Sequence, residues 1–452
     1  MILKKNTPIL LLYAYPETGN ASTISEHALS FSRYSKHLYV NVNVLKGLPT
    51  RPFFQRFKNI VLHYSLFDAI PMESLAEVID KDSHSIVAFF QDEYQKCRER
   101  YLWIETLGVK AVYTLLTPED FETVYGGCES VEHIEETLTG YVDDALIKKA
   151  DSLFKPTADR EIDIGYRARK LPFYMGKGAQ EKGNIADIFE DLSITKHLRL
   201  DLDTKERNRL YGEDWYLFLA NCKAMLGVEA GTSIFDLNGD IEEKCFRYTR
   251  DNPQANFDMV HDAILKDHEG AIYYRMVSPR VFECAAFKVL MVMFEGNYTN
   301  VLRPYEHYIP LKKDFSNIEE AMRLLNDDKK CQEIVECAHQ ELILSSKYSY
   351  RVFIKGFDAF LEKFRGVEQE TRLGVVVFCD WLRLKTFVFF FQKRHRIHFF
   401  LLEFFSNVEP RLNDQTFWLT RKLKQALRRS PFLSSTMKQI FYKIKVKVLT
   451  KD

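Results

Sequence analysis

The chain has 452 residues, of which 46% are hydrophobic and 28% charged, and these values exclude both a disordered protein and a domain with a single core. No stretch approaches the roughly 18 unbroken apolar residues of a membrane-spanning helix. The eight cysteines form no CxxC pair, which argues against structural zinc and predicts free thiols in a reducing cytoplasm. The net charge is zero, but residues 371–452 hold 17 Lys and Arg against 5 Asp and Glu, whereas residues 1–370 hold 46 against 58.

The first third of the chain alternates short apolar runs with helical patterns. Helix-compatible stretches such as 71–82 and 94–108 separate the runs. Strands that are apolar throughout and alternate with helices predict a parallel, doubly wound sheet. The first run is too short for a signal peptide and lacks a small-residue cleavage site, so we predict that it is the first strand. The predicted strands lie within 8–15, 37–45, 59–67, 85–94 and 111–116.

A second series of strands and helices begins at residue 160. It predicts a second doubly wound domain, because its order is again strand, helix, strand. We therefore predict an α/β protein with two Rossmann-like domains, 1–155 and 156–365, and a basic, amphipathic helical extension over 366–452. The segments of the second series are 160–169, 181–198, 216–236, 278–296 and 307–343.

Three cations follow the first predicted strand of this second series. Ligands of open α/β sheets bind beyond the carboxyl ends of the strands. The sequence "DIGYRARKLPFYMGKG" places Arg167, Arg169 and Lys170 there, ahead of two glycines. Cations beside flexible backbone at the start of a helix suit a diphosphate. The alternative is that these side chains are ordinary solvated charges.

A small-residue turn in "LGVEAGTSIFD" is a second candidate site. Gly231 allows a ligand to approach the backbone, and Thr232 and Ser233 can hydrogen-bond sugar or phosphate oxygens, with Glu229 beside them. The alternative is an ordinary helix N-cap.

Arg280 and Glu283 lie at positions i and i+3 in "SPRVFECAA", just ahead of an apolar run. An ionised carboxylate beside a core is costly unless it is paired. One interpretation is a structural bridge between the two side chains across a helical turn. The other is that Glu283 accepts hydrogen bonds from the two hydroxyls of a ribose. The sequence leaves both open.

Two residues of the first domain are candidates for a general base. His63 ends an apolar strand in "VLHYS", where it can meet an acceptor hydroxyl. Asp92, in "FFQDEY", follows the next predicted strand and is the second candidate. A core or surface role is the alternative for the histidine.

Residues 160–365 resemble the C-terminal half of GT-B glycosyltransferases, in particular the glycosyl transferases group 1 set that includes spore-maturation-protein-like sequences. The blocks "VLHYS" and "FFQDEY" are similar to parts of the N-terminal half. The resemblance implies two facing domains around a cleft, a nucleotide-sugar donor on the second domain, an acceptor on the first, and no bound metal or other cofactor. The blocks that carry it, in the expected order, are "DIGYRARKLPFYMGKGAQEKG", "LYGEDWYLFLANCKAMLGVEAGTSIFDLNGDI", "SPRVFECAAFKVLMVMFEGNY" and "HYIPLKKDFSN".

The resemblance also implies roles for the residues named above. Glu283 falls where such enzymes hold the ribose, with Arg280 beside it, the three cations fall near the diphosphate, and the 229–233 turn faces the sugar. Two positions depart from the family pattern. Arg275 stands where retaining members often have a glutamate, so retention is not implied. Lys288 stands where relatives usually have glycine, and it could crowd the donor site or add a phosphate contact.

We therefore predict a cytoplasmic glycosyltransferase that moves a sugar from a nucleoside diphosphate to an acceptor hydroxyl, on a lipid-linked or envelope glycan. The alternatives are an inactive binding or scaffold protein with this fold and a sugar-nucleotide epimerase. The tail 371–452 holds 12 of the 35 Phe residues. Its basic and aromatic residues predict peripheral contact with an anionic membrane surface on the inner face. Packing on the body or a dimer contact is the alternative, and nucleic acid is disfavoured because the tail has no recognisable module.

Overall fold

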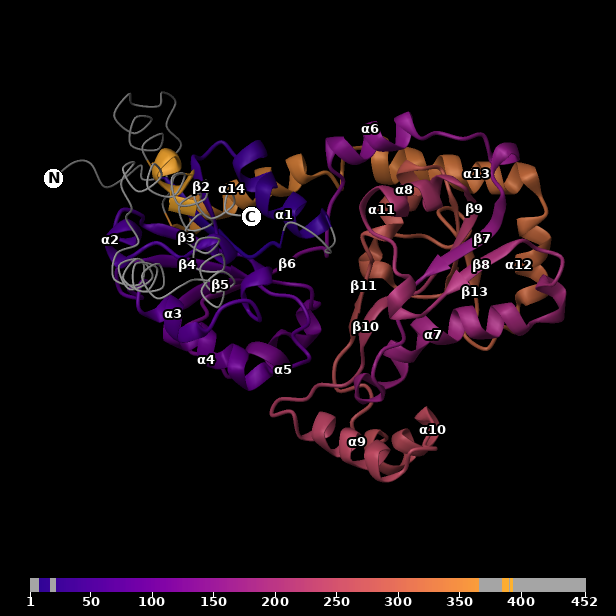
Figure 1. Cartoon of the computed structure of the whole chain (residues 1–452), viewed down its shortest axis with the longest axis horizontal. Coiled ribbons are helices and arrows are strands. Elements are labelled where there is room, and N and C mark those ends of the chain that lie inside the picture. Colours follow the sequence, from indigo (N-terminus) through magenta and orange to yellow (C-terminus); the bar gives the residue numbers. More distant parts are fainter. Residues whose placement is uncertain (1–7, 17–21, 366–383, 390, 393–452) are drawn as a thin grey trace, which may run out of the picture.

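The computed structural model describes residues 8–16, 22–365, 384–389 and 391–392 (Figure 1). Two α/β bodies lie side by side, and each is built on one parallel sheet with helices packed against both faces. The predicted fold class, two doubly wound domains, is confirmed.

The N-terminal body contains a six-stranded parallel sheet in the order β2-β1-β3-β4-β5-β6. The five predicted strands are present because their apolar runs are buried on both faces. The sixth was not predicted, since "HIEE" is a charged, mostly exposed edge strand. The strands are β1 (Ile9–Tyr13), β2 (Tyr39–Asn43), β3 (Asn59–Leu62), β4 (Ser85–Phe89), β5 (Val109–Thr114) and β6 (His133–Glu136).

The C-terminal body contains a five-stranded parallel sheet in the order β13-β12-β9-β7-β8. In both sheets the winding reverses beside the first strand, between β1 and β3 in one and between β7 and β9 in the other. Ligands bind at such reversal points, beyond the carboxyl ends of the strands. The strands are β7 (Ile162–Arg167), β8 (Leu200–Asp203), β9 (Cys222–Gly227), β12 (Leu290–Phe294) and β13 (Ile309–Leu311).

Helices cover the two faces of each sheet, and the last long helix returns to the first body. Helix α14 packs beside α1, with the ring of Phe357 centred 5.1 Å from that of Phe31 and 5.5 Å from that of Phe89. The chain therefore crosses between the bodies twice. The N-terminal body holds α1 (Ser22–Tyr34), α2 (Arg51–Phe54), α3 (Met72–Ala76), α4 (Cys97–Leu107), α5 (Phe121–Tyr125) and α14 (Tyr350–Arg365). The C-terminal body holds α6 (Asp144–Ser152), α7 (Gly176–Asp191), α8 (Gly212–Ala220), α11 (Arg280–Ala286), α12 (Ile318–Leu325) and α13 (Asp328–Ala338).

An insertion between β9 and α11 was not predicted from the sequence. Its antiparallel ribbon is formed by β10 (Ala230–Thr232) and β11 (Tyr274–Met276). Helices α9 (Asp240–Asp251) and α10 (Phe257–Val260) lie at its far end, away from both sheets (Figure 1). They have a small apolar core of their own.

Part of the predicted C-terminal extension packs on the N-terminal body. Residues 384–389 are helical. Leu384 and Val388 are buried in the core of that body, and the ring of Phe387 stacks on Phe53 at 5.4 Å. The rest of the extension lies outside the described residues. Within the described residues, no helix is long and apolar enough to cross a membrane.

Candidate functional site

A cavity of about 480 Å³ opens beyond the carboxyl ends of β7 and β9, at the reversal point of the C-terminal sheet. We call it the C-terminal cavity. Arg167, Gly227 and Glu283 line it from the C-terminal body, and Thr23 of α1 lines it from the other body. It therefore lies in the cleft between the bodies, where the sequence predicted the donor site.

Glu283 is partly buried in this cavity, on the first turn of α11. Its Oε2 accepts a hydrogen bond from the indole Nε1 of Trp215 at 2.9 Å. The Arg280 guanidinium lies 5.0 Å from the centre of the Trp215 ring, and among the described residues no ion pair joins Arg280 to Glu283. Burial raises the pKa of Glu283 to about 7. Of the two interpretations of this pair, the arrangement favours a carboxylate that faces a cavity over a structural bridge.

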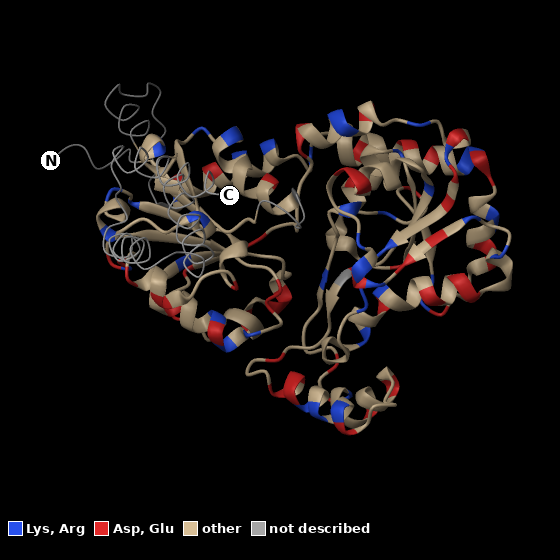
Figure 2. Ribbon diagram, viewed as in Figure 1, with Lys and Arg blue, Asp and Glu red and all other residues tan. Residues whose placement is uncertain are grey.

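Lys182 and Arg169 supply positive charge to the cleft. Lys182, on α7, lines the C-terminal cavity and both neighbouring cavities described below. Arg169 is exposed and lines two of the three. Within the part of the chain that the structure describes, neither side chain donates a hydrogen bond or forms an ion pair. Burial, with a smaller contribution from nearby Arg280, lowers the pKa of Lys182 to about 8. Figure 2 shows several basic segments along the edge of the C-terminal body that faces the N-terminal body.

The other two predicted cations already have partners. Arg167 is the last residue of β7, and its Nη2 donates to Asp201 Oδ1 at 2.8 Å. Lys170 Nζ donates to Asp187 Oδ2 at 2.5 Å. Arg167 still lines the C-terminal cavity, whereas Lys170 lines only the neighbouring one. Free positive charge therefore comes from Arg169, which the sequence predicted, and from Lys182, which it did not.

The start of α7 was expected to offer its N–H groups to a phosphate. The structure shows that a carboxylate of the insertion occupies this position, because the Lys177 N–H donates to Glu269 Oε1 at 2.7 Å. Gly165 lies inside β7, where a Cβ would come 2.4 Å from Cys222 Sγ. The glycine is required there for packing.

The 229–233 segment is satisfied by protein partners and forms β10 in place of a turn or N-cap. Glu229 is buried, and its Oε1 accepts the N–H groups of two consecutive residues, 297 and 298, at 2.8 Å each. Thr232 donates to the carbonyl of Met175, and Ser233 donates to Glu269 Oε2, both at 2.5 Å. Thr232 thus bonds the insertion to the start of α7, and Ser233 does so through Glu269. Glu229 bonds it to residues 297 and 298.

Gly231 is required by a close approach of the backbone. It has φ +142°, and a Cβ at this position would lie 1.7 Å from the carbonyl oxygen of Tyr274 on the paired strand. Gly231 also lines a cavity of about 430 Å³ between the bodies, which we call the bridging cavity.

A third cavity of about 640 Å³ lies beyond the carboxyl ends of β1 and β3, at the reversal point of the N-terminal sheet. We call it the N-terminal cavity. Asp92 lines it and the bridging cavity, and Lys182 lines both from the opposite wall. Asp92 is exposed, has φ +59°, and accepts a hydrogen bond from the Tyr94 hydroxyl at 3.0 Å.

His63 is buried at the end of β3 and is 1% exposed. Its Nδ1 accepts the Ser65 N–H at 3.1 Å, and its ring packs against those of His27 and Tyr64. Burial, and secondarily His27, lower the pKa of His63 well below its ordinary value. His63 lines none of the three cavities. The geometry therefore favours Asp92 over His63 as the group that meets an acceptor.

Lys288 does not crowd the C-terminal cavity. It has φ +52° at the end of α11, which explains why glycine suits this position. Its Nζ pairs with Glu336 Oε2 on α13 at 2.9 Å, and it is not among the residues that line the cavity.

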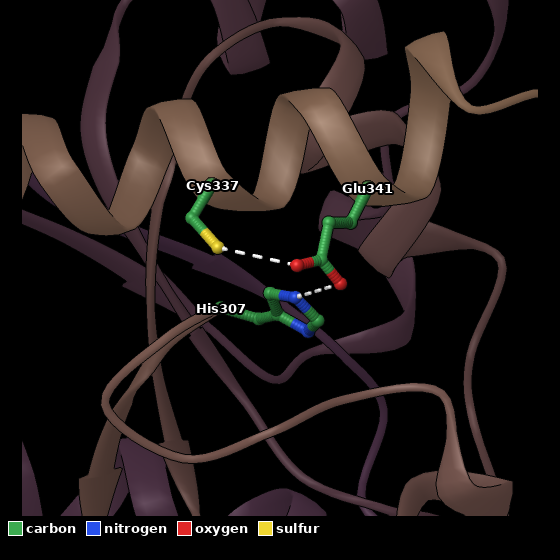
Figure 3. Close-up of side chains that lie close together, drawn as sticks. All are labelled: His307, Cys337 and Glu341. Atoms are coloured by element: carbon green, nitrogen blue, oxygen red, sulfur yellow. Dashed lines mark hydrogen bonds and ion pairs between the residues drawn. The ribbon is translucent and has the colours of Figure 1, made fainter.

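A cluster of possible metal ligands lies elsewhere, at His307, Cys337 and Glu341 (Figure 3). Arg303 Nη2 already donates to both oxygens of Glu341, at 2.7 and 2.8 Å. The Arg303 N–H donates to His307 Nδ1 at 3.2 Å, so Nε2 carries the proton and donates to Glu341 at 3.3 Å. A metal-binding histidine has the opposite arrangement, with its other ring nitrogen donating. The cluster therefore fits an ion-pair network.

No family model and no curated protein sequence matches the chain. Among solved structures, it is similar to Anabaena Alr3699/HepE in complex with UDP and glucose, at 9% identity over 79% of this chain and 100% of that chain, with a TM-score of 0.47. It is also similar to an alpha-glucosyltransferase in complex with UDP-glucose and DNA containing an abasic site, at 11% identity over 80% and 99%, with a TM-score of 0.47. A third is a glycosyltransferase from Rickettsia africae ESF-5, at 11% identity over 80% and 99%, with a TM-score of 0.38.

With TM-scores below 0.5, these likenesses carry no functional conclusion for this chain. Two doubly wound bodies, with cavities between them that residues of both bodies line, form the GT-B architecture that the sequence resemblance implies.

Proposed function

We propose that this protein is a glycosyltransferase that binds a nucleoside-diphosphate sugar in the C-terminal cavity and transfers the sugar to a hydroxyl in the N-terminal cavity. One observation carries the proposal. Glu283 and two cations without protein partners, Arg169 and Lys182, line a single cavity at the reversal point of a doubly wound sheet. A carboxylate suits a ribose diol and cations suit a diphosphate, so the cavity complements both ends of a nucleotide.

Residues of the two bodies take different parts in the proposed reaction. We call the surfaces that face the cleft the C-terminal wall and the N-terminal wall. The acceptor oxygen forms a bond to the anomeric carbon, while the bond from that carbon to the diphosphate oxygen breaks and leaves its electron pair on the phosphate. Lys182 and Arg169 neutralise this developing charge, so we propose transfer that needs no metal ion. Asp92 takes the acceptor proton. We place Asp92 ahead of His63 for this role because only Asp92 lines a cavity.

Arg280 has a supporting role in this proposal. Its guanidinium covers the Trp215 ring, whose indole N–H donates to Glu283. We propose that this stack orients the carboxylate toward the ribose. Glu229, Thr232 and Ser233 were first predicted to face the sugar, but all three are hydrogen-bonded within the protein. We propose that they hold the insertion in place instead.

We also propose that the acceptor is presented at an anionic membrane surface on the cytoplasmic side. Leu45 lines the N-terminal cavity and is 50% exposed. Gln392 Nε2 donates to the Asn43 carbonyl beside it, and Phe387 and Phe389 on the same segment are 43% and 54% exposed. This apolar rim next to the cavity suits the lipid part of a lipid-linked acceptor. Exposed basic residues on the same body suit an anionic surface, namely Arg51, Arg56, Lys58 and Lys385.

The alternatives are a scaffold without turnover and an epimerase. Lys288 was the feature that favoured a scaffold, and it points away from the cavity toward Glu336. An epimerase has no use for an acceptor site, whereas the N-terminal cavity measures about 640 Å³.

The testing experiment is a calorimetric titration of the full chain with UDP, GDP, ADP, CMP and dTDP. We expect one of them to bind at micromolar strength and to bind at least about tenfold more weakly to Glu283→Ala, because charge-assisted hydrogen bonds are lost. Glu319→Ala, which removes an exposed carboxylate from α12, is the control. Binding of none of the five nucleotides would overturn the proposal.

A further inference from the structure

Strand β11 belongs to the C-terminal part of the chain but has side chains on both walls of the cleft. Ile272, Tyr274 and Met276 are buried in the core of the N-terminal body. Successive side chains of a strand point to opposite sides, so Arg275 leaves on the other side. Figure 1 shows β10 and β11 between the two bodies.

Tyr274 is bonded to the segment that carries Asp92. Its hydroxyl donates to Glu93 Oε2 at 2.7 Å and accepts the Asp92 N–H at 2.7 Å. Glu93 is fully buried, and its Oε1 accepts from Thr114 and Tyr125. A non-glycine residue with positive φ is held by its surroundings. For Asp92, the bond from its N–H to the Tyr274 hydroxyl acts together with the bond from Arg100 Nη2 to its carbonyl at 3.1 Å.

Arg275 is bonded to the helix that carries Lys182. Its Nη1 donates to both oxygens of Glu181 at 3.0 Å, and the two side chains are only 10% and 12% exposed. The guanidinium lies against Gly178, where a Cβ would be 2.4 Å from Nη2. Glu181 directly precedes Lys182. Strand β11 therefore contacts both the segment that carries Asp92 and the helix that carries Lys182, and these two residues face each other across the cleft.

We propose that β11 is a positioning strand that holds Asp92 and Lys182 at a fixed separation, with Tyr274 as the positioning residue on the N-terminal side and Arg275 on the C-terminal side. The inference rests on the proposed function, because it gives a purpose to the separation between a proton acceptor and a diphosphate-binding cation. A large rotation of the bodies would have to break both hydrogen bonds of the Tyr274 hydroxyl and withdraw Ile272 and Met276 from the core.

The test compares the full chain with Tyr274→Phe, which removes the hydroxyl and keeps the ring in the core. Tyr273→Phe is the matched control, because this neighbouring tyrosine is 46% exposed and its hydroxyl reaches only Glu229, at 3.4 Å. Two readouts are used, amide hydrogen exchange of residues 90–97 and turnover of UDP-, GDP- and ADP-glucose. We expect Tyr274→Phe to speed exchange in 90–97 and to lower kcat about 10- to 100-fold, since misplacement of a reacting group has this effect. KM for the donor should stay within about twofold, since the C-terminal cavity is unchanged.

Arg275→Lys is the second variant and serves also if Tyr274→Phe does not fold. It keeps the charge and loses the bonds to both oxygens of Glu181. We expect a similar fall in kcat with unchanged exchange in 90–97. Unchanged exchange in Tyr274→Phe would overturn the inference, and so would faster exchange with unchanged kcat, because Tyr274 would then only support the fold. A wild-type chain that binds and turns over none of the sugar nucleotides would overturn the proposed function, while exchange in 90–97 would still decide whether Tyr274 holds Asp92.

Discussion

The two walls of the cleft differ in how their charges are balanced. On the C-terminal wall, Arg169 and Lys182 face the cavities without a counter-ion among the described residues. On the N-terminal wall, Lys96 pairs with Asp68 at 2.7 Å, and Arg100 donates to backbone carbonyls, including that of Asp92 at 3.1 Å. The first wall therefore has positive charge to offer, and the second does not.

This difference indicates which ligand each wall suits. Unpaired cations favour an anion with several oxygens, such as a diphosphate. A wall whose cations are already bonded, and on which a carboxylate remains exposed, suits a neutral hydroxyl that must lose a proton. The fold repeats the same winding in both bodies. The two reversal points therefore have the same architecture but different charged groups, with unpaired cations at one and an exposed carboxylate at the other.

The largest expected effect comes from Asp92→Asn. If Asp92 takes the acceptor proton, turnover should fall about 10²- to 10⁴-fold, because this is the usual contribution of a general base. Nucleotide affinity should be unchanged, since Asp92 is absent from the lining of the C-terminal cavity. Steady-state turnover and calorimetry on the same preparation check both statements. Asp68→Asn, which removes another carboxylate of the N-terminal cavity, is the control. An equal loss of nucleotide binding in Asp92→Asn would remove the distinction between the walls.

Lys182→Met should have the next largest effect. Loss of a charge-assisted hydrogen bond to a phosphate should weaken binding of the nucleoside diphosphate that the titration identifies, about 10- to 100-fold. Lys170→Met is the matched control, because Lys170 lies on the same stretch of chain but already pairs with Asp187. Calorimetry of both variants measures the difference. If Lys170→Met weakens binding as much as Lys182→Met, the phosphate lies near Lys170, as the sequence predicted.

The pH dependence of binding sharpens the comparison further. Burial raises the pKa of Glu283 to about 7, so this carboxylate loses its charge, and binds ribose hydroxyls less well, as the pH falls through 7. Burial lowers the pKa of Lys182 to about 8, so this cation loses its charge as the pH rises through 8. Nucleotide affinity should therefore be greatest between pH 7 and 8, and it should be roughly tenfold weaker at pH 6.

Two changes separate the low-pH and high-pH parts of this profile. Glu283→Gln should remove only the loss of affinity at low pH, which we call the acid limb. The nucleoside of the nucleotide that binds, which has no phosphate, should keep the loss of affinity at low pH and show none at high pH. An acid limb that persists in Glu283→Gln would show that another group titrates there.

The sequence predicts the sheets better than the site. Short apolar runs identify five of the six strands of the first sheet, β1 to β5, since these runs are largely buried. Residues 350–365 have no local feature that assigns α14 to the first body, because that contact joins Phe357 to Phe31 across more than 300 positions. The insertion was missed for a related reason. Its strands are only three residues long and pair with each other across 41 intervening residues.

Within the site, the sequence gives residue types but not their partners. Glu283 lies on the first turn of α11 and lines a cavity, and its role in holding a ribose stays a prediction. Nothing in the sequence distinguishes Lys170 from Lys182 as a ligand for phosphate. The structure shows that Lys170 pairs with Asp187. Trp215, which donates to Glu283, lies 68 positions away from it. Such pairings depend on tertiary packing, which a single sequence does not encode in any local pattern.

The smallest expected effect concerns the outer rim of the N-terminal wall. The full chain should sediment with vesicles of phosphatidylcholine and phosphatidylglycerol and not with phosphatidylcholine alone, because the basic residues need an anionic surface. Phe389→Ser should weaken this binding about fivefold, since roughly half of a phenyl ring loses its apolar environment. Phe154→Ser is the matched control, because Phe154 is 59% exposed and lies on the C-terminal body. Equal losses in the two variants would mean that the lipid surface does not distinguish the bodies. A third outcome is that Phe389→Ser binds vesicles as well as the wild type does, while the wild type is a dimer and the variant a monomer. The rim would then be a contact between two chains, and the two walls would differ only in their cavities.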